Sequence, residues 1–74
     1  MNLMLLKEKC VEISYCFYQE RIQEGLGMLE AVLGMILQVP EFGDLINPLL
    51  EAVEGKDYVL AADIFYHEVA MQIG

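Results

Sequence analysis

The sequence predicts an all-α fold: a small bundle of about four helices, arranged as two helical hairpins. Three observations lead to this class. Apolar residues recur at steps of three and four, no segment alternates with period two, and threonine is absent. At 74 residues the chain is too short for two domains or for a large α/β enzyme fold. We therefore expect one helical domain over residues 1–74, with hairpins at about 2–38 and 47–72 and a linker at 39–46.

The first hairpin is predicted from two apolar stripes that do not share a register. One stripe consists of Leu3, Leu6, Cys10, Ile13 and Phe17, and the other of Ile22, Leu26, Leu29, Leu33 and Ile36. Within each stripe the step is three or four residues, as on one face of a helix, whereas the step from Phe17 to Ile22 is five. This break predicts a turn near residues 18–20. One long helix running to Gln38 is the alternative, because neither glycine nor proline marks the turn.

Proline and glycine mark the boundaries of the second hairpin. Pro40 disfavours helix in the residue before it and separates the two hairpins. We expect the third helix to begin at Asn47 and Pro48, with Asn47 as the N-cap and Pro48 at the first helical position. Gly55 is expected to end this helix as its C′ residue. Asp57 then caps a fourth helix that reaches to about residue 72.

The fourth helix carries two apolar stripes, where an isolated surface helix shows one. The first stripe is formed by Tyr58, Ala61, Ala62, Phe65 and Val69, and the second by Leu60, Ile64 and Met71. We expect the first stripe to face the protein's own core and the second to face a second copy of the chain. The sequence therefore predicts a homodimer whose interface includes Leu60, Ile64 and Met71.

The composition favours association with protein over binding to nucleic acid or membrane. Apolar residues make up 57% of the chain, and a domain of this size buries only about 60% of the surface that its unfolded chain exposes. The net charge of −8 lies entirely in residues 22–74, which excludes binding to nucleic-acid phosphates. The longest charge-free stretch, residues 31–40, falls far short of the roughly 20 residues of a spanning helix. Since no signal-peptide pattern opens the chain, we expect a cytoplasmic protein without a membrane partner.

A weak internal repeat relates the two hairpins. A shift of 36 residues aligns two segments, starting at Ile22 and Tyr58, that have the same order of large and small residues. Gly25 and Ala61 occupy the equivalent small position, where a neighbouring helix can approach closely. The stretch of residues 56–65, which overlaps the second segment, resembles the second helix of a tetratricopeptide hairpin. This resemblance implies a fold of helical hairpins that pack against one another.

Asp63 and His67 are the one pair that suggests chemistry. At positions i and i+4 they would share a helical face, and a two-fold dimer would bring two such pairs together as a four-ligand metal site. The other interpretation is a surface pair of little energy. Cys10 and Cys16 would point in different directions from one helix and cannot form a disulfide. We expect Cys10, which lies in the apolar stripe, to be a small buried hydrophobe.

The second helix also contains a ribbon of small residues. Gly27, Ala31 and Gly34 would permit close helix contact, although a glycine in a helix costs about 1 kcal/mol relative to alanine. No catalytic residue and no cofactor is predicted. We expect a non-enzymatic protein–protein interaction or adaptor module. The alternatives are a small acidic export or flagellar-type chaperone, and a metal-binding helical protein that uses Asp63 and His67.

Overall fold

A computed structural model describes residues 2–74; residue 1 of the predicted domain lies outside them. The elements in chain order are α1 (Leu3–Tyr18), α2 (Ile22–Leu37), the 3₁₀-helix η1 (Pro40–Leu45), α3 (Ile46–Glu54), α4 (Tyr58–Asp63), the π-helix η2 (Ile64–Val69) and the 3₁₀-helix η3 (Ala70–Gln72). The predicted all-α class is confirmed. Since α1 and α2 are separate helices, the alternative of one long helix running to Gln38 is wrong.

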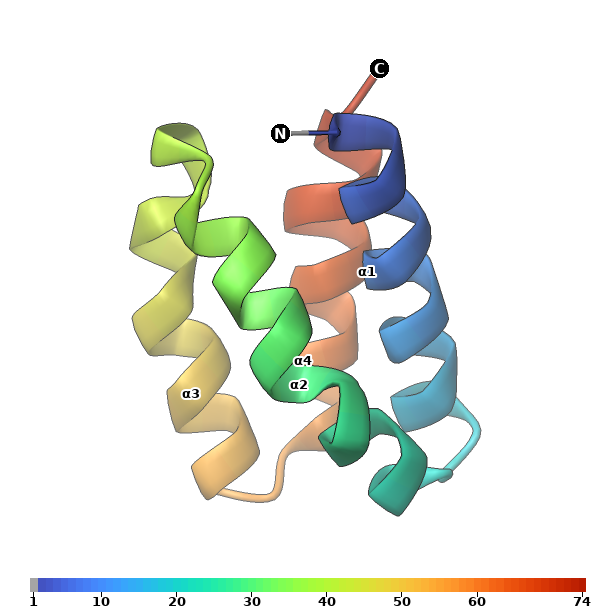
Figure 1. The fold of residues 1–74 in the computed structure, drawn as a ribbon. Coiled ribbons are helices and arrows are strands. Elements are labelled where there is room, and N and C mark those ends of the chain that lie inside the picture. Colours follow the sequence, from blue (N-terminus) through green and yellow to red (C-terminus); the bar gives the residue numbers. More distant parts are fainter. Residues whose placement is uncertain (1) are drawn as a thin grey trace.

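The helices form a four-membered ring around one core (Figure 1). Helix α1 packs against α2 on one flank and against α4 on the other, and α3 lies opposite α1, in contact with α4 and α2. The chain runs alternately down and up the bundle, so both termini lie at the same end. There the Nζ atom of Lys7 donates a hydrogen bond to the backbone carbonyl of Ile73 at 3.2 Å. This bond ties the last residues of the chain to α1.

Helix α1 ends in a Schellman motif that has no glycine. Glu20 takes the left-handed conformation with φ 61°, which is costly for a residue that has a Cβ atom. Two backbone hydrogen bonds close the motif: Arg21 N–H to the carbonyl of Cys16 at 2.8 Å, and Glu20 N–H to the carbonyl of Phe17 at 3.2 Å. The turn predicted near residues 18–20 from the five-residue step between Phe17 and Ile22 is therefore confirmed.

The turn between α3 and α4 repeats this geometry 36 residues later. Lys56 has φ 58°, Asp57 N–H donates to the carbonyl of Ala52 at 2.8 Å, and Lys56 N–H donates to the carbonyl of Val53 at 3.0 Å. The left-handed C′ residue is therefore Lys56, and the prediction that Gly55 takes this role is wrong by one position. Gly55 itself has φ −80°. The shift that aligns the two sequence segments also aligns the two turns.

Of the two N-caps predicted for the second hairpin, Asp57 is confirmed and Asn47 is wrong. The Oδ1 atom of Asp57 accepts a hydrogen bond from Leu60 N–H at 3.1 Å, which confirms Asp57 as the cap of α4. Asn47 is not a cap. Helix α3 begins at Ile46, directly after the 3₁₀ turn η1, and its N-cap position is Leu45. Because the chain is already helical at Asn47, this residue lacks the extended backbone that a capping side chain needs.

The last helix is α-helical only over its first part. After α4 the chain continues without a break into the π-helix η2 and then into η3. A π-helix closes hydrogen bonds from i to i+5, so each of its turns takes up one additional residue. Residues after Val69 are therefore rotated by roughly 100° relative to a straight α-helix. The predicted uninterrupted helix from Asp57 to about residue 72 needs this correction.

The ring of Phe17 lies in the core and explains why position 25 must be small. The Phe17 ring lies 5.4 Å from that of Tyr58 and 6.4 Å from that of Phe65, measured between ring centroids. A Cβ atom on Gly25 would lie 2.6 Å from Cε1 of Phe17, so only glycine lets α2 approach α1 this closely. Ala61 is fully buried. The close approach predicted at Gly25 is confirmed.

Candidate docking surface

The predicted dimer interface on the last helix does not form one exposed stripe. Ile64 is 8% exposed and packs in the chain's own core, whereas Leu60 is 45% and Met71 is 59% exposed. The prediction that Ile64 faces a second copy is therefore wrong. In a straight α-helix Ile64 and Met71 would lie two turns apart on one face, but the π-helical turn between them rotates Met71 away. A contact of Leu60 and Met71 with another chain stays a prediction.

Asp63 and His67 are not the pair that their spacing suggested. The two lie across the junction of α4 and η2, and no ion pair joins them within the described residues. Asp63 instead accepts a hydrogen bond from the hydroxyl of Tyr18 on α1, and the exposed His67 ring lies edge-on to Tyr66 at 5.1 Å. Within residues 2–74 no three side chains of the metal-binding types gather in a suitable group.

Asp63 belongs to a group of side chains that joins the outer edges of α1 and α4–η2. We call this group the seam cluster and define it as Tyr15, Tyr18, Asp63 and Tyr66. The rings of Tyr15 and Tyr66 stack with centroids 6.3 Å apart and planes 25° from parallel. Burial, the hydrogen bond to Asp63 and the charge of Asp63 raise the pKa of Tyr18 to about 12. At neutral pH its hydroxyl therefore stays protonated and holds the carboxylate in place.

Both cysteines are buried and free. Burial raises the pKa of Cys10 to about 12, and burial also raises the pKa of Cys16 above its usual value. Because the thiolate is the reactive form of cysteine, neither side chain is suited to nucleophilic chemistry. Cys16 packs at the junction of α1 and α2, where its Sγ atom lies 3.8 Å from Oε2 of Glu24. The prediction that Cys10 is a buried hydrophobe is confirmed.

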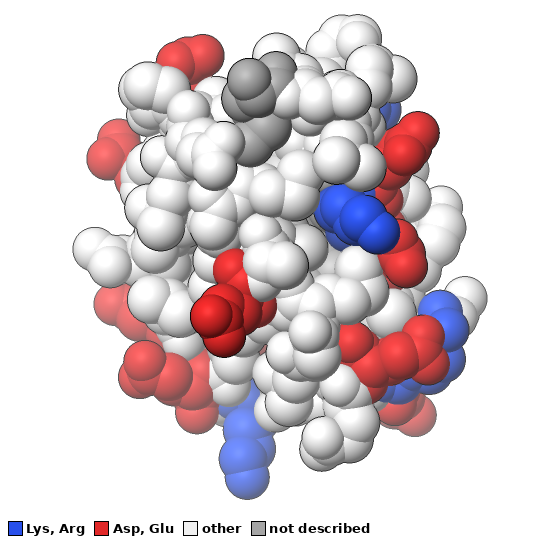
Figure 2. Space-filling view, viewed as in Figure 1, with Lys and Arg blue, Asp and Glu red and all other residues white. Residues whose placement is uncertain are grey.

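The outer face of α2 carries a shallow apolar groove. A depression of about 250 Å³ between α1 and α2 is lined by Lys9, Gly27, Met28, Ala31, Val32 and Met35. An adjoining hollow of about 520 Å³ shares Gly27, Ala31 and Met35 with it and adds Glu30, Gly34 and Gln38. We call the two together the α2 groove. Figure 2, in which α2 faces the viewer, shows a broad uncharged area over the upper part of this side of the molecule.

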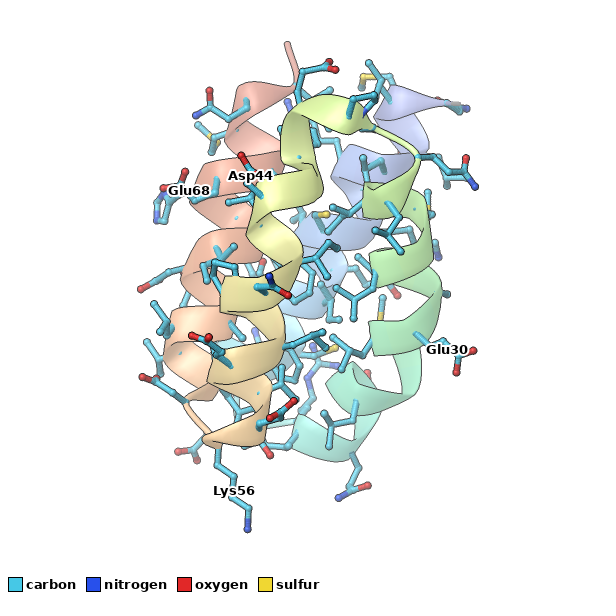
Figure 3. All side chains as sticks on the ribbon, turned by 90° about the vertical axis from the view of Figure 1, so that its left-hand side faces the viewer. Glu30, Asp44, Lys56 and Glu68 are labelled. Atoms are coloured by element: carbon cyan, nitrogen blue, oxygen red, sulfur yellow. The ribbon has the colours of Figure 1, made fainter. Side chains whose placement is uncertain are left out.

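The small residues of α2 form the floor of this groove. A Cβ atom on Gly27 or Gly34 would meet nothing within 4 Å, and Ala31 is exposed. The ribbon of small residues thus exists, but no helix of the same chain packs against its glycines. Charge is confined to the two rims, with Lys9 on the α1 side and Glu30 on the other. Figure 3 shows Glu30 pointing away from the bundle into solvent.

A third depression lies at the end of the bundle that holds the termini. It measures about 430 Å³ and is lined by Glu41, Phe42, Asp44, Leu45, Glu68 and Gln72. Figure 3 shows Asp44 and Glu68 there, on neighbouring elements. Its three carboxylates make it the most acidic of these depressions, and no cation of the described chain pairs with them.

Comparison with known proteins adds no relative: no family model, no curated protein and no solved structure matches the chain. Among residues 2–74, none of the helices has both the length and the apolar character needed to cross a membrane.

Sequence reasoning singled out Asp63 but not the three tyrosines that surround it in the seam cluster. Tyr18 and Asp63 are 45 residues apart in the chain, and Tyr15 and Tyr66 come from the same two helices. No local spacing connects them. The only available signal was that the exposed side of the first helix contains two tyrosines, where charged residues are usual for a solvated face.

Proposed function

We propose that the protein is a non-enzymatic protein-interaction module that self-associates through the α2 groove. The observation that carries this proposal is the open space at Gly27 and Gly34. Each glycine lies inside a helix, where it costs about 1 kcal/mol relative to alanine, and neither avoids a clash within the chain. Residues that lower stability without a local reason are expected at functional surfaces.

The chemistry of the groove suits a helix as its occupant. Small residues on the floor let another helix backbone approach closely, and the flexible side chains of Met28 and Met35 can adapt to its surface. Burying this face would also remove apolar surface from water, which is the main favourable term in association. A single chain leaves large apolar side chains exposed, among them Leu37 at 63% and Met71 at 59%.

The rim charges favour a second copy of the chain as that occupant. Lys9 and Glu30 lie on opposite rims, and each lines a depression that Ala31 also lines. Suppose that two α2 helices pack face to face and run parallel about a two-fold axis. The Lys9 rim of each copy then meets the Glu30 rim of the other copy. Lys9 of one copy then lies opposite Glu30 of the other, twice in the dimer.

The first test is the molar mass in solution, measured by sedimentation. We expect the wild type to be dimeric at tens of micromolar and Ala31→Arg to be monomeric, because an arginine on the groove floor blocks close approach. Asn47→Arg is the matched control: it adds the same charge at an exposed position of α3 and should leave the dimer intact. A wild type that is monomeric at this concentration contradicts the proposal.

A charge exchange tests the arrangement of the two copies. Lys9→Glu and Glu30→Lys should each weaken the dimer, because like charges then face each other across the interface. The double variant restores both pairs and should recover most of the affinity. If the loss of dimer affinity in the double variant equals the sum of the losses in the two single variants, the parallel arrangement is wrong.

A further inference from the structure

We propose that the seam cluster binds the guanidinium group of an arginine in a basic segment of a partner protein. The four side chains of the cluster combine two features that such a group recognises: a carboxylate and the faces of aromatic rings. This site is additional to the proposed self-association and does not depend on it.

Asp63 carries a negative charge that nothing in the described chain neutralises. Its carboxylate is half-buried, and one oxygen accepts the hydrogen bond from Tyr18. The ion pairs within residues 2–74 are Lys9 with Glu12 and Arg21 with Glu24, so no cation of the described chain pairs with Asp63. A partly buried carboxylate without a counter-charge attracts a cation more strongly than one in open water.

The orientation of that carboxylate is fixed by a hydrogen bond. Asp63 is held by the Tyr18 hydroxyl, which stays a donor at neutral pH because its pKa is about 12. The second oxygen of Asp63 has no protein donor in the described chain. A fixed carboxylate with a free oxygen suits the fork of N–H groups on a guanidinium, which is planar and donates in a set geometry.

An aromatic surface lies beside the carboxylate. The Tyr15 side chain is 47% exposed and that of Tyr18 is 38% exposed, and the Tyr66 ring stacks against Tyr15. Ring faces are electronegative and attract cations, more often arginine than lysine. A guanidinium plane can stack on an exposed tyrosine ring and also donate N–H groups to a carboxylate, whereas an ammonium has no plane to stack. This favours arginine over lysine.

The charge of the whole chain points to the same class of partner. The net charge is −8, and all of it lies in residues 22–74, which include α4 and η2. A field of this sign raises the local concentration of basic segments and speeds their encounter with the protein. The seam cluster supplies the specific contact that a diffuse negative field lacks.

The seam cluster and the α2 groove lie on opposite flanks of α1. Tyr18 contacts Asp63 on α4, whereas Lys9 borders the groove beside α2. A dimer formed through the groove therefore leaves the seam free. Variants in the groove should not change arginine binding, and variants in the seam should not change the molar mass. The failure of one proposal can thus be told apart from the failure of the other.

The test uses the peptide acetyl-Gly-Gly-Arg-Gly-Gly-amide and its lysine counterpart as probes, followed by NMR of the full chain at about 0.15 M salt. We expect the arginine peptide to shift the ring signals of Tyr15 and Tyr66 to saturation, and the lysine peptide to bind several-fold more weakly. Asp63→Asn should weaken arginine binding at least about tenfold. Glu51→Gln, which removes the same charge from an exposed position of α3, should change it less than about twofold.

Folding of Asp63→Asn is checked by its thermal unfolding curve, and Tyr15→Leu gives a second variant that leaves the carboxylate and its hydrogen bond in place. Tyr15→Leu should also weaken arginine binding. Three results would overturn the proposal: no binding of the arginine peptide, equal binding of the lysine peptide, or equal weakening by Asp63→Asn and Glu51→Gln. The last result would mean that only the net charge of the protein attracts the peptide.

Discussion

The hydroxyl of Tyr18, in the last turn of α1, donates a hydrogen bond to the carboxylate of Asp63, at the end of α4. This bond joins two helices at their outer edges, beside the core contact of Phe17 with Tyr58 and Phe65. It also stabilises the protonated form of Tyr18 and so couples this contact to pH at the alkaline end of the scale.

The first prediction concerns this coupling. The pKa of Tyr18 is raised from 10 to about 12 in the folded protein. A raised pKa adds stability that is complete below the unfolded value and is lost as pH rises through the folded value. The free energy of unfolding should therefore fall between pH 10 and 12 more steeply in the wild type than in Tyr18→Phe. Urea titrations at pH 7, 10 and 12 measure this, and parallel pH profiles would contradict the assignment.

The second prediction concerns the two left-handed turn residues. Glu20 and Lys56 hold φ near +60° without being glycine. Glu20→Gly and Lys56→Gly should each stabilise the protein by about 0.5–1 kcal/mol, because glycine adopts this conformation without strain. Gln19→Gly, at a neighbouring position with φ −92°, serves as the control and should not stabilise. Thermal unfolding of the three variants decides, and a loss of stability in both turn variants would contradict the left-handed geometry.

The third prediction follows from the burial of Ile64. Ile64→Asp places a charge in the core and should cost at least about 3 kcal/mol. Leu60→Asp, on the exposed side of the same helix, should change stability by no more than about 0.5 kcal/mol. Chemical denaturation of the two variants at low protein concentration measures the difference. Equal effects would mean that Ile64 does not face the core.

The fourth prediction separates the glycines of α2 by their surroundings. Gly25→Ala forces a methyl group against the Phe17 ring and should cost about 1–3 kcal/mol. Gly27→Ala meets only open space and should stabilise the helix by up to about 1 kcal/mol. Melting temperatures that shift in opposite directions are the expected result. A stabilised Gly25→Ala variant would show that α1 and α2 do not approach closely at Phe17.

The elements of the bundle could be predicted because apolar spacing within one helix is a local property. The step of five from Phe17 to Ile22 located the first turn, and Asp57 was recognised as a cap from its position before an apolar stripe. The start of α3 was missed because η1 delivers the chain to Ile46 already in a helical conformation. The direct passage from η1 into α3 depends on how residues 39–45 fold. The types of residue at positions 47 and 48 do not determine this.

The errors at the candidate site have a different cause. The stripe of Leu60, Ile64 and Met71 assumes 3.6 residues per turn throughout the last helix. The π-helix η2 breaks that assumption between Ile64 and Val69. The seam cluster arises from contacts between α1 and α4–η2, which only the packed bundle creates.

If the small residues of α2 serve close contact with a second chain, Gly34→Gln should separate stability from association. Glutamine is a good helix former and Gly34 faces open space, so the variant should unfold at a higher temperature than the wild type. Its long side chain would at the same time fill the α2 groove. Sedimentation should therefore show a dimeric wild type and a more stable but monomeric Gly34→Gln. A variant that is more stable and still dimeric would contradict the claim.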